Sequence, residues 1–226
     1  MTYQETRNRL ETYFDQTASK TWERLTSDAP VSRIRQTVRE GRDAMRSELL
    51  SILPQDLTGA RVLDAGAGAG TASIALAERG AFVTAVDISP SLLDVAERRT
   101  PDHLKGRISY RAGDMLDPEL GHFDAVFAMD SLIHYTAPDI ARALDNLTRR
   151  TTGPVAFTVA PKTVLLTAMW WAGKAFPRSD RSPAIQPHRT QSILKHLKKH
   201  TSSGTLSEHA RVSRGFYISQ AMEARA

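Results

Sequence analysis

Short β-rich runs and helical segments alternate regularly between residues 60 and 159, and this alternation constrains the fold more than any other feature. The β-rich runs are Ala60–Asp64, Phe82–Asp87, Ile108–Ala112, Phe123–Met129 and Val155–Val159. Helical segments are expected between them, near Thr71–Arg79, Ser91–Arg99 and Asp139–Arg149. Regular β-α alternation predicts a parallel, doubly wound sheet with right-handed crossovers. We therefore expect an α/β fold.

The segments on either side of this core extend the predicted fold. Apolar residues recur at helical spacing near the start, at Leu10, Tyr13 and Phe14 in one helix and at Ile34, Val38, Met45, Leu49 and Leu50 in the next. At the other end, Thr205–Val212 and Gly215–Met222 are expected to form a closing antiparallel hairpin. The prediction is an N-terminal helical cap over residues 1–58, followed by a domain over 59–226 with a mostly parallel, seven-stranded, Rossmann-like sheet.

Residues 162–188 interrupt the alternation. Trp170 and Trp171 precede a stretch rich in proline and arginine, residues 176–183. Such a stretch predicts a lid-like insertion rather than another βα unit. A basic helix is then expected over Gln191–His200.

The composition is that of an ordinary globular protein, with 226 residues, 41% hydrophobic and 24% charged. No run approaches the ~18 to 20 apolar residues that cross a bilayer, and the N-terminus lacks the apolar core of a secretion signal. The absence of cysteine excludes disulfides, thiolate metal sites and cysteine nucleophiles. We expect a cytoplasmic protein. Its net charge of +5 would attract nucleic acid, an anionic membrane or an anionic substrate, or would only aid solubility.

A glycine-rich turn directly follows the first β-rich run. Gly66, Gly68 and Gly70 let the backbone approach a ligand closely. The dinucleotide pattern G-x-G-x-x-G fails, because Thr71 stands where its third glycine would be. The turn resembles motif I of class I S-adenosylmethionine methyltransferases. That resemblance implies that Asp64 meets the methionine end of the cofactor.

Two further acidic residues follow the next two β-rich runs. Asp87 ends the second run, where a carboxylate can accept hydrogen bonds from both ribose hydroxyls. Asp114, in Gly113-Asp114-Met115, resembles the adenine-binding corner of such methyltransferases. Each aspartate alone could be a helix cap or a turn residue. Together they predict S-adenosylmethionine at the carboxyl edge of the sheet, where doubly wound folds bind ligands.

Nearly end to end, the chain resembles the magnesium-protoporphyrin IX O-methyltransferase family. The shared segments are Tyr13-Phe14, Trp22, Arg39-x-Gly41, Asp64–Gly70, Asp87-Ile88-Ser89, Asp130-x-Leu132-Ile133-His134-Tyr135, Ala160-Pro161-Lys162-Thr163, Phe176-Pro177 and Phe216-Tyr217-x-Ser219. The resemblance implies methyl transfer to the ring C propionate of magnesium-protoporphyrin IX, giving the monomethyl ester in chlorophyll and bacteriochlorophyll biosynthesis. The chain departs from the family at Thr26, where a tyrosine is common, and at Arg42, where histidine is frequent.

The strand ends and the resemblance together give the candidate site. The expected cofactor-binding residues are Arg39, Gly41, Asp64, Gly66, Gly68, Gly70, Asp87, Ile88, Asp114, Met115, Met129 and Asp130. The expected substrate-binding residues are Tyr13, Lys162, Trp170, Arg178, Arg181 and His188. No metal site of the protein's own is expected.

His134 is the candidate catalytic residue. A propionate with a pKa near ~4.5 is already ionised at neutral pH, so its attack on a sulfonium methyl needs no strong base. His134 could donate a hydrogen bond to that carboxylate, remove a residual proton, or ligate the porphyrin's magnesium. The alternative is a packing histidine at a strand end.

Nucleic acid is not expected as a partner. The chain lacks the Asn/Asp-Pro-Pro-aromatic motif of amino-methyltransferases and the cysteine of base C5-methyltransferases. Residues 195–200 could face an anionic membrane peripherally, contact the large subunit of magnesium chelatase, or form a solvated helix face. Two rival functions remain, an O-methyltransferase of another small carboxylate or phenol, and a non-catalytic nucleotide-binding scaffold.

Overall fold

The structure is a computed structural model that describes residues 2–18, 33–163, 184–201 and 204–226. A seven-stranded sheet in the order β3-β2-β1-β4-β5-β7-β6 forms its centre. The strands are β1 (Arg61–Ala65), β2 (Phe82–Asp87), β3 (Ile108–Ala112), β4 (Ala125–Ala128), β5 (Val155–Val159), β6 (Thr205–Arg214) and β7 (Tyr217–Arg225). Neighbouring strands among β1 to β5 are parallel, and β7 is antiparallel to both β5 and β6. The predicted mostly parallel sheet and its closing hairpin are confirmed.

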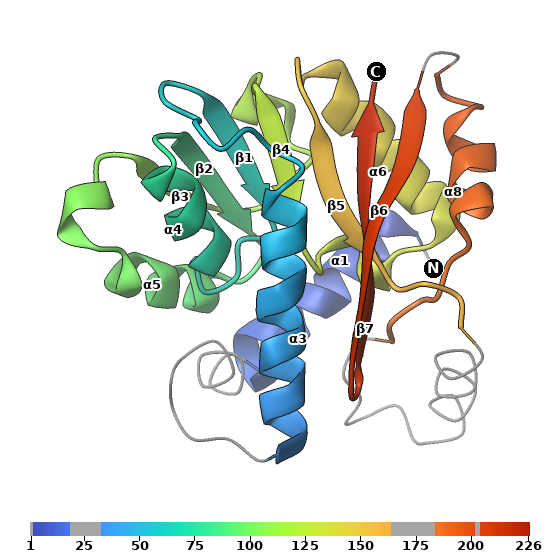
Figure 1. Cartoon of the computed structure of the whole chain (residues 1–226), viewed down its shortest axis with the longest axis horizontal. Helices are drawn as coiled ribbons and strands as arrows, with labels where there is room; N and C mark the ends of the chain where they lie inside the picture. The colour runs from blue at the N-terminus through green and yellow to red at the C-terminus, as the bar shows by residue number, and fades with distance from the viewer. Residues whose placement is uncertain (1, 19–32, 164–183, 202–203) are drawn as a thin grey trace.

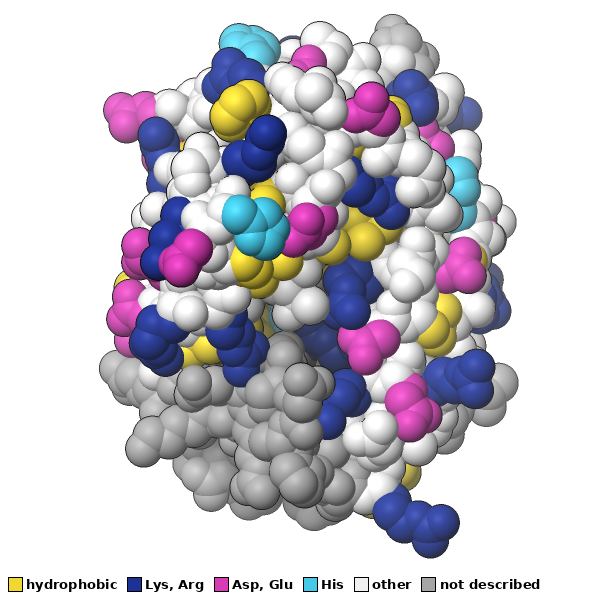
Figure 2. All heavy atoms as spheres, turned by 60° about the vertical axis from the view of Figure 1, so that its left-hand side comes forward, with side chains coloured by type: hydrophobic (Ala, Val, Ile, Leu, Met, Phe, Trp, Pro, Cys, Tyr) yellow, Lys and Arg dark blue, Asp and Glu magenta, His cyan; other side chains and the backbone are white. Residues whose placement is uncertain are grey.

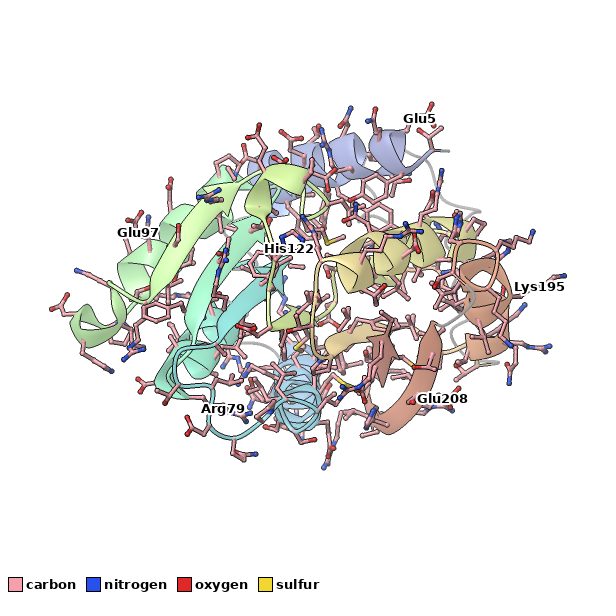
Figure 3. All side chains as sticks on the ribbon, turned by 90° about the horizontal axis from the view of Figure 1, so that it is seen from above. Glu5, Arg79, Glu97, His122, Lys195 and Glu208 are labelled. Atoms are coloured by element: carbon pink, nitrogen blue, oxygen red, sulfur yellow. The ribbon has the colours of Figure 1, made fainter. Side chains whose placement is uncertain are left out.

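Helices cover both faces of this sheet (Figure 1). One face packs against α3 (Arg33–Leu50), α4 (Thr71–Glu78) and α5 (Pro90–Arg99), through a cluster that includes Met45, Leu76 and Leu93. The other face packs against α1 (Tyr3–Thr12), α6 (Ala137–Arg149) and α8 (Thr190–Leu197), through Leu10, Leu144 and Ile193. Seen from above, α1 and α6 lie on one side and α3 on the other (Figure 3). The helices of the predicted cap thus share their cores with the sheet.

Local sequence signals account for the helix starts. Ser89 caps α5 by accepting from the Leu92 N–H, with Pro90 in the first turn. Thr136 caps α6 in the same way, through the Asp139 N–H. Thr2 and Glu5 form a reciprocal capping box at the start of α1. Short helical turns η1 (Tyr13–Ala18), η2 (Asp102–Leu104), η3 (Pro118–Leu120) and η4 (Leu132–His134) connect the main elements.

Three sequence expectations need correction. Ile34 was expected on the buried face of its helix, but it is 58% exposed, because the first turn of α3 carries it away from the core. Tyr13 and Phe14 follow α1 in the π-helical turn η1 rather than in the same α-helix, although Phe14 still packs against the core cluster that contains Leu10. The fourth strand is shorter than expected, since Phe123 makes only an isolated bridge to Thr151 and Met129 lies beyond the strand.

The expected lid lies mostly outside the described residues, because 164–183 are not described. The two described ends of that segment run side by side. Pro161 and His188 form a parallel bridge, and the Lys162 N–H donates to the carbonyl of His188 at 2.9 Å. Within the described ranges, no helix is both long and apolar enough to span a membrane.

Candidate active site

The glycine-rich loop connects β1 to α4 at the carboxyl edge of the sheet. Gly66, Gly68 and Gly70 have φ values of +90°, +54° and +79°, a region that residues with a Cβ rarely adopt. The N–H groups of Gly66 and Ala67 donate to the Val86 carbonyl at 2.8 and 3.0 Å, which ties the loop to β2. A Cβ on Gly66 would lie 2.5 Å from the Cβ of Ser131. The loop therefore packs directly against the segment that follows β4.

Asp64 lies beneath this loop rather than on its surface. Its residue exposure is 1%, and its Oδ2 accepts a 2.5 Å hydrogen bond from the Ser73 hydroxyl on α4. Burial raises the pKa of Asp64 from 3.8 to about 7, and the negative charge of Asp87 adds to this effect. Asp64 thus supports the loop through Ser73, and its contact with the methionine end of the cofactor stays a prediction.

Replacement of Asp64 by asparagine is expected to flatten the pH dependence of stability. Because its pKa is raised in the folded state, wild-type Asp64 takes up a proton on folding between about pH 3.8 and 7. The free energy of unfolding therefore falls as pH rises through this window, by at most about 1.4 kcal/mol per pH unit. Urea unfolding at pH 5, 6, 7 and 8 should show this slope in wild type and less of it in Asp64→Asn. Equal slopes would contradict the buried, titrating carboxyl.

Asp87 joins the end of β2 to the glycine loop. Its Oδ2 accepts from the Gly68 N–H at 2.8 Å, and its Oδ1 accepts from the Ser89 N–H at 2.9 Å. Burial raises the pKa of Asp87, which these backbone donors oppose. A carboxylate has about four acceptor positions, so these bonds leave acceptor capacity for a ligand hydroxyl.

The N-terminal helix crosses the same edge of the sheet. The Tyr3 hydroxyl donates to Asp114 Oδ1 at 2.8 Å, and Arg7 pairs with Asp114 Oδ2 at 3.2 Å. The Tyr3 ring stacks on Tyr135 with centroids 4.8 Å apart. Burial raises the pKa of both phenols, and the charge of Asp114 adds to this effect. In this structure Asp114 anchors α1 over the carboxyl ends of β3 and β4.

A second anchor lies further along the N-terminal segment. Asp15 in η1 accepts from the Ser91 N–H at 3.2 Å and from the Ser89 hydroxyl at 3.3 Å. These bonds hold η1 against the start of α5, next to Asp87. The half-buried Tyr13 and Phe14 are thereby placed near the same edge, and Phe14 contacts His134 with ring centroids 6.1 Å apart.

The segment that leads into α8 holds three successive carbonyls, two in the η4 turn and one in Tyr135 directly after it. Gln186 donates from its backbone to Ile133 at 2.8 Å and from its side chain to His134 at 2.9 Å. His188 Nε2 lies 2.8 Å from the Tyr135 carbonyl, and since a carbonyl only accepts, this nitrogen carries the proton. Burial lowers the pKa of His188. His188, expected to bind substrate, thus uses one ring nitrogen to support η4.

The remaining expected residues lie at different depths. Met115 is only 7% exposed and lies in the core, while Ile88 and Met129 are partly buried. The backbone of Gly41 is covered by Tyr217, whose ring carbon lies 2.7 Å from where a Cβ would be. Arg39 is half-buried on α3, and the Lys162 side chain is exposed. Trp170, Arg178, Arg181 and the early Trp22 and Thr26 lie outside the described residues.

Asp130 connects elements far apart in the sequence. Its carboxylate accepts from the Tyr217 hydroxyl at 3.0 Å and pairs with Arg42 at 3.4 Å. Sequence reasoning assigned no role to Arg42 or Tyr217, and it missed Tyr3, Arg7 and Gln186 altogether. For Tyr3 and Arg7 a signal existed, because residues four apart lie on one helix face. For the others, no local pattern indicated the partner.

Charge is distributed rather than concentrated on the face that carries α5. There, Lys and Arg side chains are interspersed with Asp and Glu (Figure 2). Examples are the exposed pairs Lys105–Asp102 and His103–Glu78. The net charge of +5 therefore does not form a single cationic patch on this face.

Comparison with known families matches both halves of the chain. Residues 62–152 match the model of a methyltransferase domain. Residues 128–226 match the C-terminal region of magnesium-protoporphyrin IX methyltransferases. The second match includes η4, β5 and the closing hairpin.

Similar proteins extend over nearly the whole chain. A magnesium-protoporphyrin O-methyltransferase of Rhodobacter capsulatus is 55% identical, with 99% of this chain and 98% of that protein covered. A protein of the same description from Synechocystis is 28% identical, with 94% and 93% covered. The crystal structure of the Synechocystis magnesium protoporphyrin IX methyltransferase with bound S-adenosylhomocysteine has a TM-score of 0.80 at 27% identity, covering 97% of this chain and 99% of that one.

Proposed function

Because this chain belongs to the magnesium-protoporphyrin IX O-methyltransferase family, we infer that it transfers a methyl group from S-adenosylmethionine to a propionate of magnesium-protoporphyrin IX. We assign the reaction to the ring C propionate, giving the monomethyl ester of (bacterio)chlorophyll biosynthesis. The similarity to this family over nearly the whole chain carries the inference. The close packing of Ser131 on Gly66 agrees with it. It brings the segment particular to the family, Leu132–Tyr135, beside the cofactor loop.

The described residues fit S-adenosylmethionine. The loop backbone has three glycines at positive φ, and Asp87 keeps acceptor capacity for a ligand hydroxyl. Ser131 Oγ is buried next to Gly66 and has no hydrogen-bond partner within the described residues. A polar ligand group at this point would supply that partner. When bound, S-adenosylmethionine supplies an electrophilic sulfonium methyl group.

The chain's own residues then have two tasks. The first is to align the carboxylate oxygen with the methyl carbon, which can lower the barrier by on the order of 7 to 11 kcal/mol. The second is to keep water from the carboxylate without binding it too tightly. The α1–η1 segment and the η4 turn are suited to both, because they meet at this edge through the Tyr3–Tyr135 and Phe14–His134 contacts.

We assign the steering of the substrate carboxylate to His134. Its ring is half-buried at the end of η4, next to Phe14. Its Nδ1 lies 3.5 Å from the Ala184 carbonyl, which can only accept. A proton on Nδ1 would let the ring donate to that carbonyl. An imidazole protonated on both nitrogens is a donor only, and such a ring can hydrogen-bond to an anionic carboxylate oxygen.

Acceptor selectivity tests the proposed function. Turnover with methyl-labelled S-adenosylmethionine should be high with magnesium-protoporphyrin IX and much lower with a small phenol or an aliphatic acid. Preferential transfer to the phenol or the small acid would keep the methyltransferase class and refute the substrate. Cofactor binding without transfer to any acceptor would favour the non-catalytic scaffold.

We also propose a cytoplasmic location with a peripheral contact through the basic segment 195–200, which begins on α8. Ile193 and Leu197 are buried in the core, while Lys195, Lys198 and Lys199 are exposed to solvent. Lys195 points away from the molecule in Figure 3. An anionic membrane surface or an acidic face of the magnesium chelatase large subunit would fit this charge. Sedimentation with anionic vesicles, compared with neutral ones, tests the membrane contact.

A further inference from the structure

Among the described non-glycine residues, Asp130 alone has a positive φ, of 56°. For a residue with a Cβ this conformation costs roughly 1 to 2 kcal/mol, and it persists only where the surroundings enforce it. Asp130 lies between the end of β4 and the η4 turn that carries His134. The strain is therefore at the point where the chain is redirected from the sheet into the proposed site.

Contacts from three elements enforce this conformation. Thr158 on β5 accepts from the Asp130 N–H at 2.7 Å and donates to its Oδ1 at 3.3 Å. Tyr217 on β7 donates to the same carboxylate at 3.0 Å, and Arg42 on α3 pairs with it at 3.4 Å. The Asp130 side chain is only 9% exposed, so these interactions are little screened by solvent.

The Tyr217 ring is itself fixed by its neighbours. It packs on Gly41 of α3, where any Cβ would come within 2.7 Å of the ring. Burial raises the pKa of the Tyr217 hydroxyl, and the charge of Asp130 adds to this effect, so the phenol stays protonated as a donor. Gly41 thus has a packing reason to be glycine.

On the other side of Asp130, the next residue is in contact with the cofactor loop. Ser131 lies against Gly66, closely enough that a Cβ there would clash. The three residues after Ser131 form η4 and end at His134. Any change in the Asp130 backbone would therefore move both the wall of the cofactor loop and the proposed steering histidine.

We propose that Arg42 and Tyr217 are positioning residues, which act through the Asp130 carboxylate to hold the Asp130–His134 turn against the glycine loop. Asp130 is then part of the support of the site rather than a direct cofactor ligand, because its carboxylate is engaged by Arg42, Tyr217 and Thr158. The inference deepens the proposed function and rests on it for its catalytic consequence. Its structural part stands on the contacts of the network alone.

Two variants of the full chain test the network, and a third is a matched control. Tyr217→Phe removes the hydroxyl but keeps the ring on Gly41, so the fold should be preserved. Arg42→Gln removes the ion pair. Arg46→Gln is the control, because Arg46 lies one turn further along α3 and has a similar exposure (24% against 21%). Within the described residues, its ion pair is a local one with Asp43.

Hydrogen exchange and turnover are measured on the same proteins. In Tyr217→Phe and Arg42→Gln the amides of residues 131–135 should exchange about tenfold faster. We expect kcat with magnesium-protoporphyrin IX to fall about tenfold or more, and the Kd for S-adenosylmethionine to rise by a smaller factor, because Ser131 also borders the cofactor loop. Arg46→Gln should match wild type in all three measurements.

Unchanged exchange and unchanged kcat in both variants would overturn the proposal. So would faster exchange with wild-type kcat, because the turn would then not need this support for catalysis. If Arg46→Gln lost as much kcat as the two network variants, any change on α3 would have this effect. That result would also overturn the proposal. If wild type itself forms no ester, the proposed function fails, while the exchange comparison still decides whether the network holds the turn.

Discussion

Replacing Gly66 by alanine is expected to lower the affinity for S-adenosylmethionine by about 100-fold. Its Cβ would lie 2.5 Å from the Cβ of Ser131, and at φ +90° the added side chain is strained in any surroundings. Overpacking costs about 1 to 3 kcal/mol and the strained backbone about 1 to 3 more, so the loop must move. Titration calorimetry with S-adenosylmethionine measures the loss.

Two companion variants separate the causes. Gly59→Ala also places a Cβ at positive φ, +78°, but in open space in the turn before β1, so cofactor affinity should stay as in wild type. Ser131→Gly in the Gly66→Ala background removes the clashing atom together with the hydroxyl that would meet the ligand, so it should recover only part of the lost affinity, about tenfold. Wild-type affinity in Gly66→Ala would mean that the loop is not the cofactor site.

Replacing His134 by alanine is expected to lower kcat about 10- to 100-fold, with little change in cofactor affinity. A hydrogen bond to a charged group contributes about 1.5 to 3 kcal/mol, which corresponds to this range. The effect should appear in kcat because the bond orients the reacting oxygen rather than the cofactor. Single-turnover kinetics with magnesium-protoporphyrin IX measure the methyl-transfer step itself.

Controls for His134 use one conservative and one remote substitution. Glutamine keeps a donor near the position of a ring nitrogen, so His134→Gln should retain more activity than His134→Ala. His103→Ala changes an exposed histidine that pairs with Glu78 far from the site, and it should behave as wild type. If His134→Ala turned over at the wild-type rate, the histidine would be a packing residue.

The sheet could be predicted from sequence because its strands carry strong local signals. β1, β4 and β5 are short apolar runs almost wholly buried in the structure, and turn or cap residues separate them from the helices. The ends of the helices and strands could be predicted less well. Ile34 follows the apolar period of α3 but lies on a turn that extends beyond the core, and periodicity does not contain that information.

The site was predicted less completely, because its contacts join residues distant in sequence. The aspartates at the strand ends were found, since parallel strands bring their carboxyl ends to one edge. Their partners were not. Tyr3 meets Asp114 across 111 positions and Tyr217 meets Asp130 across 87. No spacing rule covers such pairs, and a strand pattern does not reveal that Asp64 lies below the loop while Asp87 is partly accessible.

The methylated product is best identified after incubation with magnesium-protoporphyrin IX and methyl-labelled S-adenosylmethionine. We expect one labelled methyl group per porphyrin, bound as an ester at the ring C propionate and released by alkaline hydrolysis. Label that resists hydrolysis, or a porphyrin left unmodified while another acid or phenol is methylated, would contradict the proposed function.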